Sequence, residues 1–232
     1  MKKIVLSFVL FVSFLSSAYA TEGEYTPMDD IMAPDEIAEE LGLPRTEADD
    51  ISVLNVEDVA NTEAVDLLRS FPIVIVINKK AWGPGAQRMR VYQNGYLTHE
   101  WAVSTGRERW ERARSGRTYF SVTPVGYFYP RELVRDHWSH TWQTSMEYSV
   151  FFNGGIATHA TTPSHYKELG SRASGGCVRL QKEHAQYLYT RIKEEGRGLV
   201  PLVKRNGMIS RDRYGRAMRA VKWRTLIVVE DR

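Results

Sequence analysis

Five consecutive β-branched residues, Ile73 to Ile77, constrain the fold of this 232-residue chain more than any other segment. Such side chains lose little rotamer freedom in extended backbone, and a run without a polar member predicts a strand that is buried on both faces. A sheet that contains this strand is therefore covered on both sides. The length suits one domain with extensions and is enough to bury a sizeable core.

Short strand-like segments dominate the rest of the chain. Residues 88–92 alternate basic and apolar side chains, and Asn94-Gly95 is a two-residue hairpin signal before another segment at residues 96–103. Further strands are expected at residues 119–122, 127–129, 150–152, 156–158, 200–203 and 226–229. The one convincing helix after residue 71 spans residues 181–194 and ends before Gly196. The fold class expected is mostly β (α+β) with one late helix.

The first twenty residues have the layout of a secretory signal peptide. Lys2 and Lys3 precede a largely apolar run from Ile4 to Leu15, and residues 18–20 (AYA) form an A-x-A end. That run is too short for the roughly 20 residues that cross a bilayer. We expect cleavage after Ala20, no membrane span, and an exported, periplasmic chain.

Charge divides the remainder into an acidic arm and a basic body. Residues 21–70 contain 15 acidic and two basic residues, whereas residues 71–232 contain 27 basic and 13 acidic residues. We expect a signal peptide (1–20), an acidic N-terminal arm (21–70), a catalytic domain (71–203) and a basic C-terminal extension (204–232) with an added strand. In the arm, Asp35 is expected to cap a short helix and residues 61–70 to form another, with the arm partly disordered.

Two basic clusters lie in the body, at residues 107–117 and 204–224. They are either solvated surface or attractive to carboxylate-rich peptides and anionic envelope polymers, and export argues against nucleic acid as a partner. The opposite charges of arm and body suggest a hypothesis. The arm folds back over a basic cleft and restrains it until polymer competes.

The single cysteine, Cys177, excludes an intramolecular disulfide framework and any multi-cysteine zinc or iron–sulfur site. It follows Ser174, Gly175 and Gly176, small residues that leave room for a substrate and whose backbone N–H groups can point at a developing oxyanion. Two interpretations stay open at this point. Cys177 is either a buried, inert small side chain or a catalytic nucleophile.

A cysteine nucleophile needs a base, because a thiol with an ordinary pKa of about 8.5 is only a few per cent thiolate at neutral pH. His159 stands 18 positions before Cys177, at the end of residues 154–158 (GGIAT). A strand that ends at His159 would return the imidazole to the loop that carries Cys177. The pair His137 and His140 lacks a visible third ligand, so no metal site is expected.

Several segments, taken in order, resemble a known family. They are residues 103–106 (VSTG), 123–128 (TPVGYF), 146–159 (MEYSVFFNGGIATH) and, 14 residues after His159, 174–179 (SGGCVR). Together they resemble the L,D-transpeptidase catalytic domain, the YkuD-type family of peptidoglycan enzymes, whose signature is a histidine, a spacer, S/T-H-G-C, a hydrophobic residue and Asn or Arg. The resemblance covers roughly residues 72–203 and implies a YkuD-like β-sandwich.

The resemblance implies roles for individual residues. Cys177 is expected to be the nucleophile, His159 the base, and the backbone around Gly176 the oxyanion site. Thr158 and Arg179 are expected to bind substrate, although Arg179 equally fits a structural ion pair, and Ser174 shapes the loop or holds a substrate carboxylate. One position departs from the signature, because its second histidine is Gly175 here, and no role is carried to that position.

The activity implied is transpeptidation on peptidoglycan tetrapeptide stems through a cysteine acyl-enzyme. D-Ala leaves, and the acyl group passes to an amine of a second stem, a D-amino acid or a lipoprotein lysine. No metal or organic cofactor is required. Two alternatives remain: a same-fold carboxypeptidase or hydrolase, and a non-catalytic peptidoglycan-binding module that has lost activity with the histidine at position 175.

Overall fold

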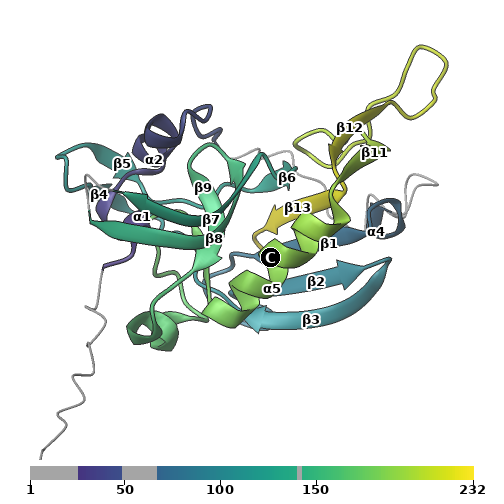
Figure 1. Ribbon diagram of the computed structural model, residues 1–232. Coiled ribbons are helices and arrows are strands. Elements are labelled where there is room, and N and C mark those ends of the chain that lie inside the picture. The colour runs from purple at the N-terminus through teal and green to yellow at the C-terminus, as the bar shows by residue number, and fades with distance from the viewer. Residues whose placement is uncertain (1–25, 49–66, 140–142) are drawn as a thin grey trace, which may run out of the picture.

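A computed structural model describes residues 26–48, 67–139 and 143–232 of the chain (Figure 1). The expected signal peptide lies outside these residues. In order across the sheet, the first sheet comprises β3 (Tyr96–Ala102), β2 (Arg88–Gln93), β1 (Ile73–Asn78), β13 (Thr225–Glu230) and β6 (Gly126–Phe128). The second comprises β10 (Val178–Leu180), β9 (Ile156–Ala160), β8 (Thr144–Asn153) and β7 (Glu132–Ser139).

Two short strand pairs and five helical segments complete the described elements. The pairs are β4 (Trp110–Arg112) with β5 (Thr118–Phe120) and β11 (Arg197–Pro201) with β12 (Arg219–Trp223). The helical segments are α1 (Met28–Ile31), α2 (Pro34–Leu41), α4 (Leu67–Ser70), the 3₁₀ helix η1 (Pro163–Glu168) and α5 (Lys182–Glu195). None of the helices in the described ranges has the length and apolar character needed to cross a membrane.

Strand β1 is buried along its whole length, as its uninterrupted β-branched run predicts. It pairs in parallel with β13 on one side and antiparallel with β2 on the other. Ile73, Ile75 and Ile77 belong to a core that also contains residues of β8, β9, β10 and α5. Val74 and Val76 belong to a second core, which includes residues of α4. The two faces of β1 therefore serve two different cores.

The two main sheets pack with α5 around the first core, which confirms the mostly-β sandwich with one late helix. Along α5, Ala185, Leu188 and Ile192 are buried, in agreement with their helical spacing. Figure 1 shows α5 beside β8 of the second sheet, with β2 and β3 of the first sheet next to it.

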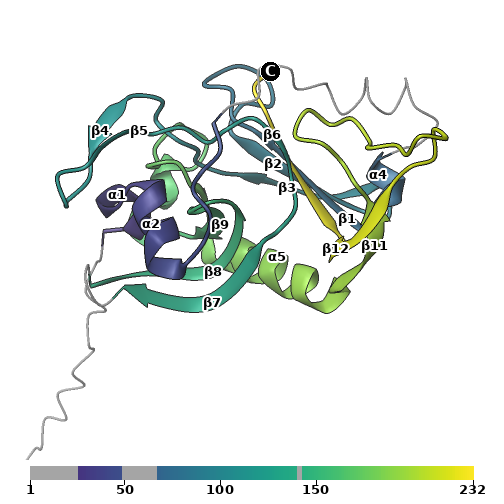
Figure 2. The same cartoon turned by 90° about the horizontal axis from the view of Figure 1, so that it is seen from above.

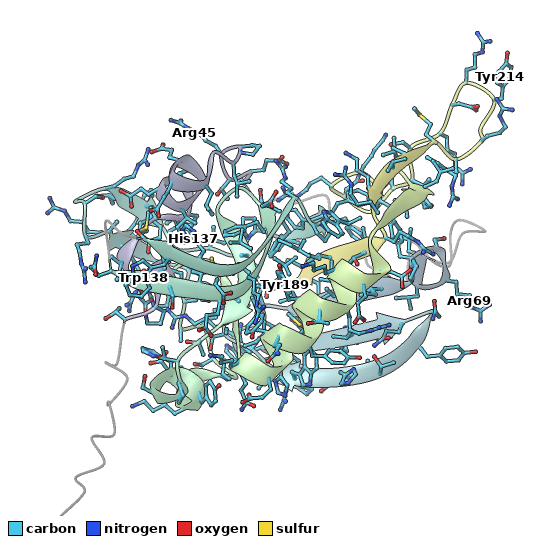
Figure 3. The ribbon with its side chains drawn as sticks, in the orientation of Figure 1. Arg45, Arg69, His137, Trp138, Tyr189 and Tyr214 are labelled. Carbon is cyan, nitrogen blue, oxygen red and sulfur yellow. The ribbon has the colours of Figure 1, made fainter. Side chains whose placement is uncertain are left out.

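The strand predicted at residues 226–229 is present as β13, and it lies between β1 and β6 inside the first sheet. Ile227 and Val229 of this strand form part of the first core. The loop between β11 and β12 projects from the body, with Tyr214 near its tip (Figure 3).

Several elements correct the sequence-based expectations. β7 was not predicted, because its residues do not alternate between apolar and polar, and His137 lies on this strand. Helix α2 begins at Pro34 after Ala33, not at a cap formed by Asp35. Pro34 suits the first helical position, and Glu36 accepts the Ala33 N–H.

Residues 26–48 of the arm are folded against the body. Helix α1 packs on β8 and α2 packs on β9, with Met28, Ile31 and Ile37 buried (Figure 2). Of the helix expected at residues 61–70, the structure describes α4 at Leu67–Ser70, and the remainder lies outside the described residues.

Burial in the core between the sheets predicts how much stability is lost when a side chain is truncated. Replacing Ile227 of β13, which is 0% exposed, by alanine removes buried methyl groups and leaves a cavity, so the free energy of unfolding is expected to fall by about 2–5 kcal/mol. Val221→Ala in β12 is the matched control, since Val221 is 60% exposed and its loss is expected to change stability by less than about 0.5 kcal/mol. Urea denaturation measures both values, and equal losses would contradict the prediction.

Candidate active site

The pairing of β9 with β10 brings the predicted base and the predicted loop together. The strands are parallel, with His159 opposite Arg179, and Cys177 directly precedes β10. The Ala157 N–H donates to Cys177 Sγ at 3.5 Å. Side chains alternate along a strand, so Ala157 and His159 share a face of β9. Thr158 points to the other face, with Ile156 of the first core, and its role in substrate binding stays a prediction.

The loop before Cys177 is fixed by hydroxyl groups. Ser174 Oγ donates to the carbonyl oxygen of Cys177 at 2.6 Å and accepts the Gly176 N–H at 3.1 Å. Gly176 has a φ of 144°, which favours glycine. Ser174 therefore shapes the loop, one of its two predicted roles. In this conformation the Gly176 N–H is engaged, so its part in an oxyanion site stays a prediction.

The upstream motifs hold the same loop from the other side. Ser104, in the VSTG segment, exchanges two backbone hydrogen bonds with Arg179. Thr123, which begins the TPVGYF segment, donates to the carbonyl oxygen of Gly176 at 2.6 Å and accepts the Gly106 N–H at 2.9 Å. Sequence analysis identified these motifs by resemblance only. In the structure, their hydrogen bonds hold the loop that carries Cys177 in position.

The orientation of His159 suits a base. Its Nδ1 lies 2.8 Å from the carbonyl oxygen of Ala160, and a carbonyl only accepts, so Nδ1 carries the proton and Nε2 has the free lone pair. Nε2 is buried and has no hydrogen-bond partner in the part of the chain that the structure describes. Burial lowers the pKa of His159 below its ordinary value, so the imidazole is neutral at pH 7.

The thiol of Cys177 is fully buried and lies 3.5 Å from the carbonyl oxygen of Gly155. Within residues 26–48, 67–139 and 143–232, no hydrogen bond joins it to His159. Burial raises the pKa of the Cys177 thiol, and the negative charge of Asp29 raises it further. The sulfur is therefore held as a neutral thiol in this conformation.

Arg179 is buried at the centre of the site. Its Nε donates to both oxygens of Asp29 at 3.1–3.2 Å, its Nη2 lies 2.6 Å from Asp30, and its Nη1 lies 3.3 Å from Glu168. Burial is the largest single influence and acts against ionisation of Asp29, but the surrounding basic groups, Arg179 first among them, together outweigh it, so the pKa of Asp29 is lowered. Of the two roles predicted for Arg179, the ion pair is present, and substrate binding stays a prediction.

Asp29 is the residue that sequence analysis missed. It lies in the arm and is 1% exposed, and its Oδ1 lies 3.6 Å from His159 Nε2. Its Oδ2 accepts the Gly175 N–H at 3.3 Å. The charge of the arm indicated that it would meet the body, but a count of charges does not say which carboxylate enters the site.

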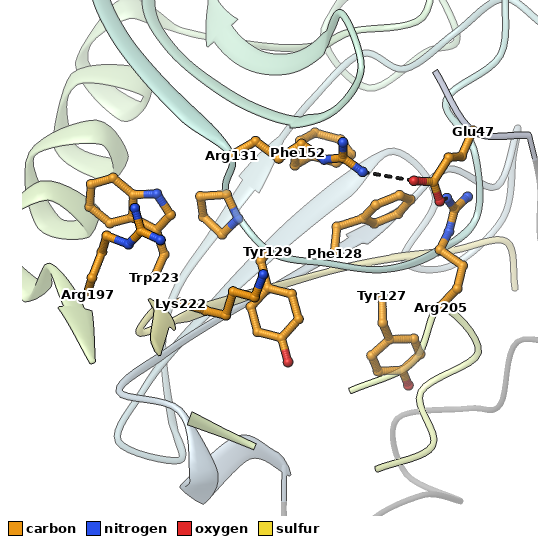
Figure 4. A pocket seen from close by; sticks show the side chains of 11 residues that line it. Glu47, Tyr127, Phe128, Tyr129, Arg131, Phe152, Arg197, Arg205, Lys222 and Trp223 are labelled. Carbon is orange, nitrogen blue, oxygen red and sulfur yellow. Dashed lines mark hydrogen bonds and ion pairs between the residues drawn. The ribbon is translucent and has the colours of Figure 1, made fainter. Parts of the chain in front are cut away.

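A cavity of about 520 Å³ is lined by Tyr129, Arg131, Arg205 and Trp223 among others, and Glu47 of the arm enters it to pair with Arg131 (Figure 4). Neither Cys177 nor His159 lines this cavity. What covers those two residues is the arm.

The chain can be compared with known proteins. The family model of the YkuD L,D-transpeptidase catalytic domain matches residues 72–205, which is more than half of the chain. No curated protein sequence matches.

Solved structures of L,D-transpeptidases are similar to this chain at low sequence identity. One from Xylanimonas cellulosilytica is 21% identical over 68% of this chain and 60% of that chain, with a TM-score of 0.45. One from Mycobacterium smegmatis is 15% identical over 69% and 59%, with a TM-score of 0.44. One from Mycobacterium tuberculosis H37Rv is 18% identical over 69% and 58%, with a TM-score of 0.42. This chain matches less than two thirds of the length of each, and the family assignment depends on the family model.

The lowered pKa of His159 predicts a pH dependence of stability. The unfolded chain binds a proton at this histidine near its ordinary pKa of 6.5, and the folded chain binds it only at lower pH. The free energy of unfolding therefore falls as pH drops below about 6.5, by at most about 1.4 kcal/mol per pH unit. Urea denaturation between pH 8 and pH 5 of the wild type and His159→Gln isolates this contribution. Parallel pH curves for the two proteins would contradict the assignment.

Proposed function

This chain belongs to the YkuD family of L,D-transpeptidase catalytic domains, and from that membership we propose that it is a peptidoglycan L,D-transpeptidase. Its substrate is a tetrapeptide stem, and its intermediate is an acyl-enzyme on Cys177. The observation that carries the proposal is the β9–β10 pairing, which brings the only cysteine and a correctly oriented imidazole to one end of the second sheet, inside the segment that the family model matches.

The first half-reaction transfers an acyl group to sulfur. His159 Nε2 takes the thiol proton, and the sulfur attacks the carbonyl carbon of the third stem residue at its L-centre. A carbon–sulfur bond forms, the bond to the nitrogen of D-Ala breaks, and the proton on His159 passes to that nitrogen. The products are a thioester on Cys177 and free D-Ala.

The second half-reaction returns the thiol. An amine from a second stem, a D-amino acid or a lipoprotein lysine attacks the thioester, and His159 takes its proton and passes it to the departing sulfur. The amide product is a cross-link or an exchanged stem. Water in place of the amine gives a tripeptide, which is the carboxypeptidase alternative. No step of this scheme requires a cofactor.

The neighbouring groups have supporting roles in this scheme. Backbone N–H groups near Gly176 stabilise the negative oxygen of the tetrahedral intermediate once the loop is free to receive it. Arg179 binds a carboxylate of the stem, as it binds Asp29 in the described conformation. Export through the signal peptide places the enzyme in the periplasm, where its substrate is.

Incubation with tetrapeptide muropeptides tests the proposal. The wild type is expected to form dimers or D-amino acid adducts, and Cys177→Ala to lower the rate by at least about 10³-fold, because no other nucleophile is available. His159→Gln is expected to lower it by about 10²–10⁴-fold. Mass spectrometry identifies the products, and a tripeptide adduct on Cys177 identifies the intermediate.

Each product supports or excludes one interpretation. Tripeptides without dimers indicate the hydrolase. Unchanged substrate, together with retained binding to sacculi, indicates the non-catalytic module. That result overturns the proposal if variants in which the arm no longer covers Cys177 are inactive as well.

A further inference from the structure

Apolar side chains of the arm close the site over the sulfur. Met28, Ile31, Met32 and Ile37 form one buried cluster with Cys177 and with residues of β8 and β9. In that cluster Met28 and Ile37 are 0% exposed, as is Cys177 itself. A peptide can reach the sulfur only after these side chains have moved.

Acidic side chains of the arm occupy the polar groups of the same site. The Asp29 carboxylate accepts hydrogen bonds from Arg179 and from the Gly175 N–H, and it lies beside His159 Nε2. Asp30 lies 2.6 Å from Arg179 Nη2 and 2.8 Å from Arg107 Nη1. Of the three carboxylates that surround Arg179, only Glu168 belongs to the body, so displacement of the arm leaves the guanidinium without two of its partners. The site therefore has a built subsite for a carboxylate.

The backbone of the arm lies directly against two glycines of the body. A Cβ at Gly175 would overlap the carbonyl oxygen of Asp29, and a Cβ at Gly155 would overlap that of Pro34. Neither glycine has a positive φ, so the local backbone conformation does not require glycine at either position. Glycine is required at both positions because the backbone of the arm occupies the space that a side chain would need. Position 175 is also where the family signature carries histidine.

Two small cavities remain at the ends of the covering segment. One, of about 180 Å³, is lined by Ala33, Pro34 and Ile156 at the start of β9. The other, of about 150 Å³, is lined by Pro27 and Ala160 at the end of β9. Residues 27–34 thus lie along β9, between these two cavities.

The rest of the described arm is tied to the body by charge. The acidic side chains involved pair with partners from four different parts of the body: Glu36 with Ser115, Glu39 with Arg117, Glu40 with His137 and Ser139, and Glu47 with Arg131 and Arg205. The Glu47 backbone also exchanges two hydrogen bonds with the Asn153 side chain. Figure 2 shows the arm following the body from α1 past α2, and Figure 4 shows the ion pair between Glu47 and Arg131.

We propose that residues 26–48 are an autoinhibitory pseudosubstrate, in which the Asp29 carboxylate fills the subsite that receives a carboxylate of the stem peptide. The inference rests on the proposed function for the identity of that peptide, but the occlusion itself does not. The arm inhibits in two ways. It excludes ligands from the sulfur, and it places a negative charge beside the pair that must form a thiolate. Activation is displacement of the arm by an acidic polymer or its removal.

Undocking α1 tests the occlusion through the chemistry of one thiol. Ile31→Asp places a charge in the apolar cluster without touching the catalytic groups, and Gly175→Ala pushes the arm away from the body side. Because Cys177 is the only cysteine, the rate of iodoacetamide alkylation reports its accessibility together with its thiolate fraction, and the arm lowers both. Both variants are expected to react at least about 10-fold faster than the wild type. Glu39→Gln, which removes an exposed charge of the same arm, is the matched control and is expected to react like the wild type.

Two further measurements separate release of the arm from loss of the fold. Urea denaturation must show a cooperative transition for each variant, and a synthetic peptide of residues 26–48 added to Ile31→Asp must slow alkylation again. The same peptide with Asn in place of Asp29 is expected to protect at least about 10-fold less. Equal alkylation of wild type and undocked variants, or no protection by the peptide, overturns the proposal.

Activity on muropeptides then distinguishes the two hypotheses. Faster turnover by Ile31→Asp than by the wild type supports both. Faster alkylation with no turnover leaves the occlusion in place and overturns the transpeptidase. Slower turnover by Ile31→Asp, with its fold intact, means that the arm completes the site instead of blocking it, and overturns the autoinhibition.

Discussion

The buried guanidinium of Arg179 is the interaction on which the site depends. A charge removed from water requires a carboxylate partner, and the parallel pairing of β9 and β10 fixes this charge beside His159. Asp29 and Asp30 meet the requirement from the arm. Under the proposal above, a stem peptide takes over these contacts when it reaches Cys177, so the interaction that holds the arm in place also favours acidic ligands.

Much of the body could be predicted from the sequence because its signals are local. The β-branched run of β1, the Asn94-Gly95 turn and the helical spacing along α5 each act over a few residues. The strands without such signals were missed. β7 is half exposed and charged, and β10 is only three residues long, so neither presents a periodic pattern. The place of β13 inside the sheet is a matter of topology, which no local pattern encodes.

The predicted nucleophile and base occupy neighbouring positions of one sheet, and the upstream motifs hold the loop between them. The covering of the site could not be predicted in detail. The apolar residues of the arm are scattered among acidic ones, and the burial of residues 28–37 depends on contacts with a surface made by distant strands. Gly175 was visible in the sequence as a departure from a motif, but its physical reason is a contact with Asp29, 146 positions away.

The order of the strands bears on when the arm can dock while a new molecule folds. The first sheet has its final strand, β13, in its interior, between β1 and β6. The sheet is complete only when residues 225–230 are in place, and residues 26–48 precede them by almost the whole described chain. Residues 26–48 are thus available before the surface that they cover is complete. Under the proposed autoinhibition, the protein folds with its thiol already covered, and access to Cys177 becomes a separate, later step.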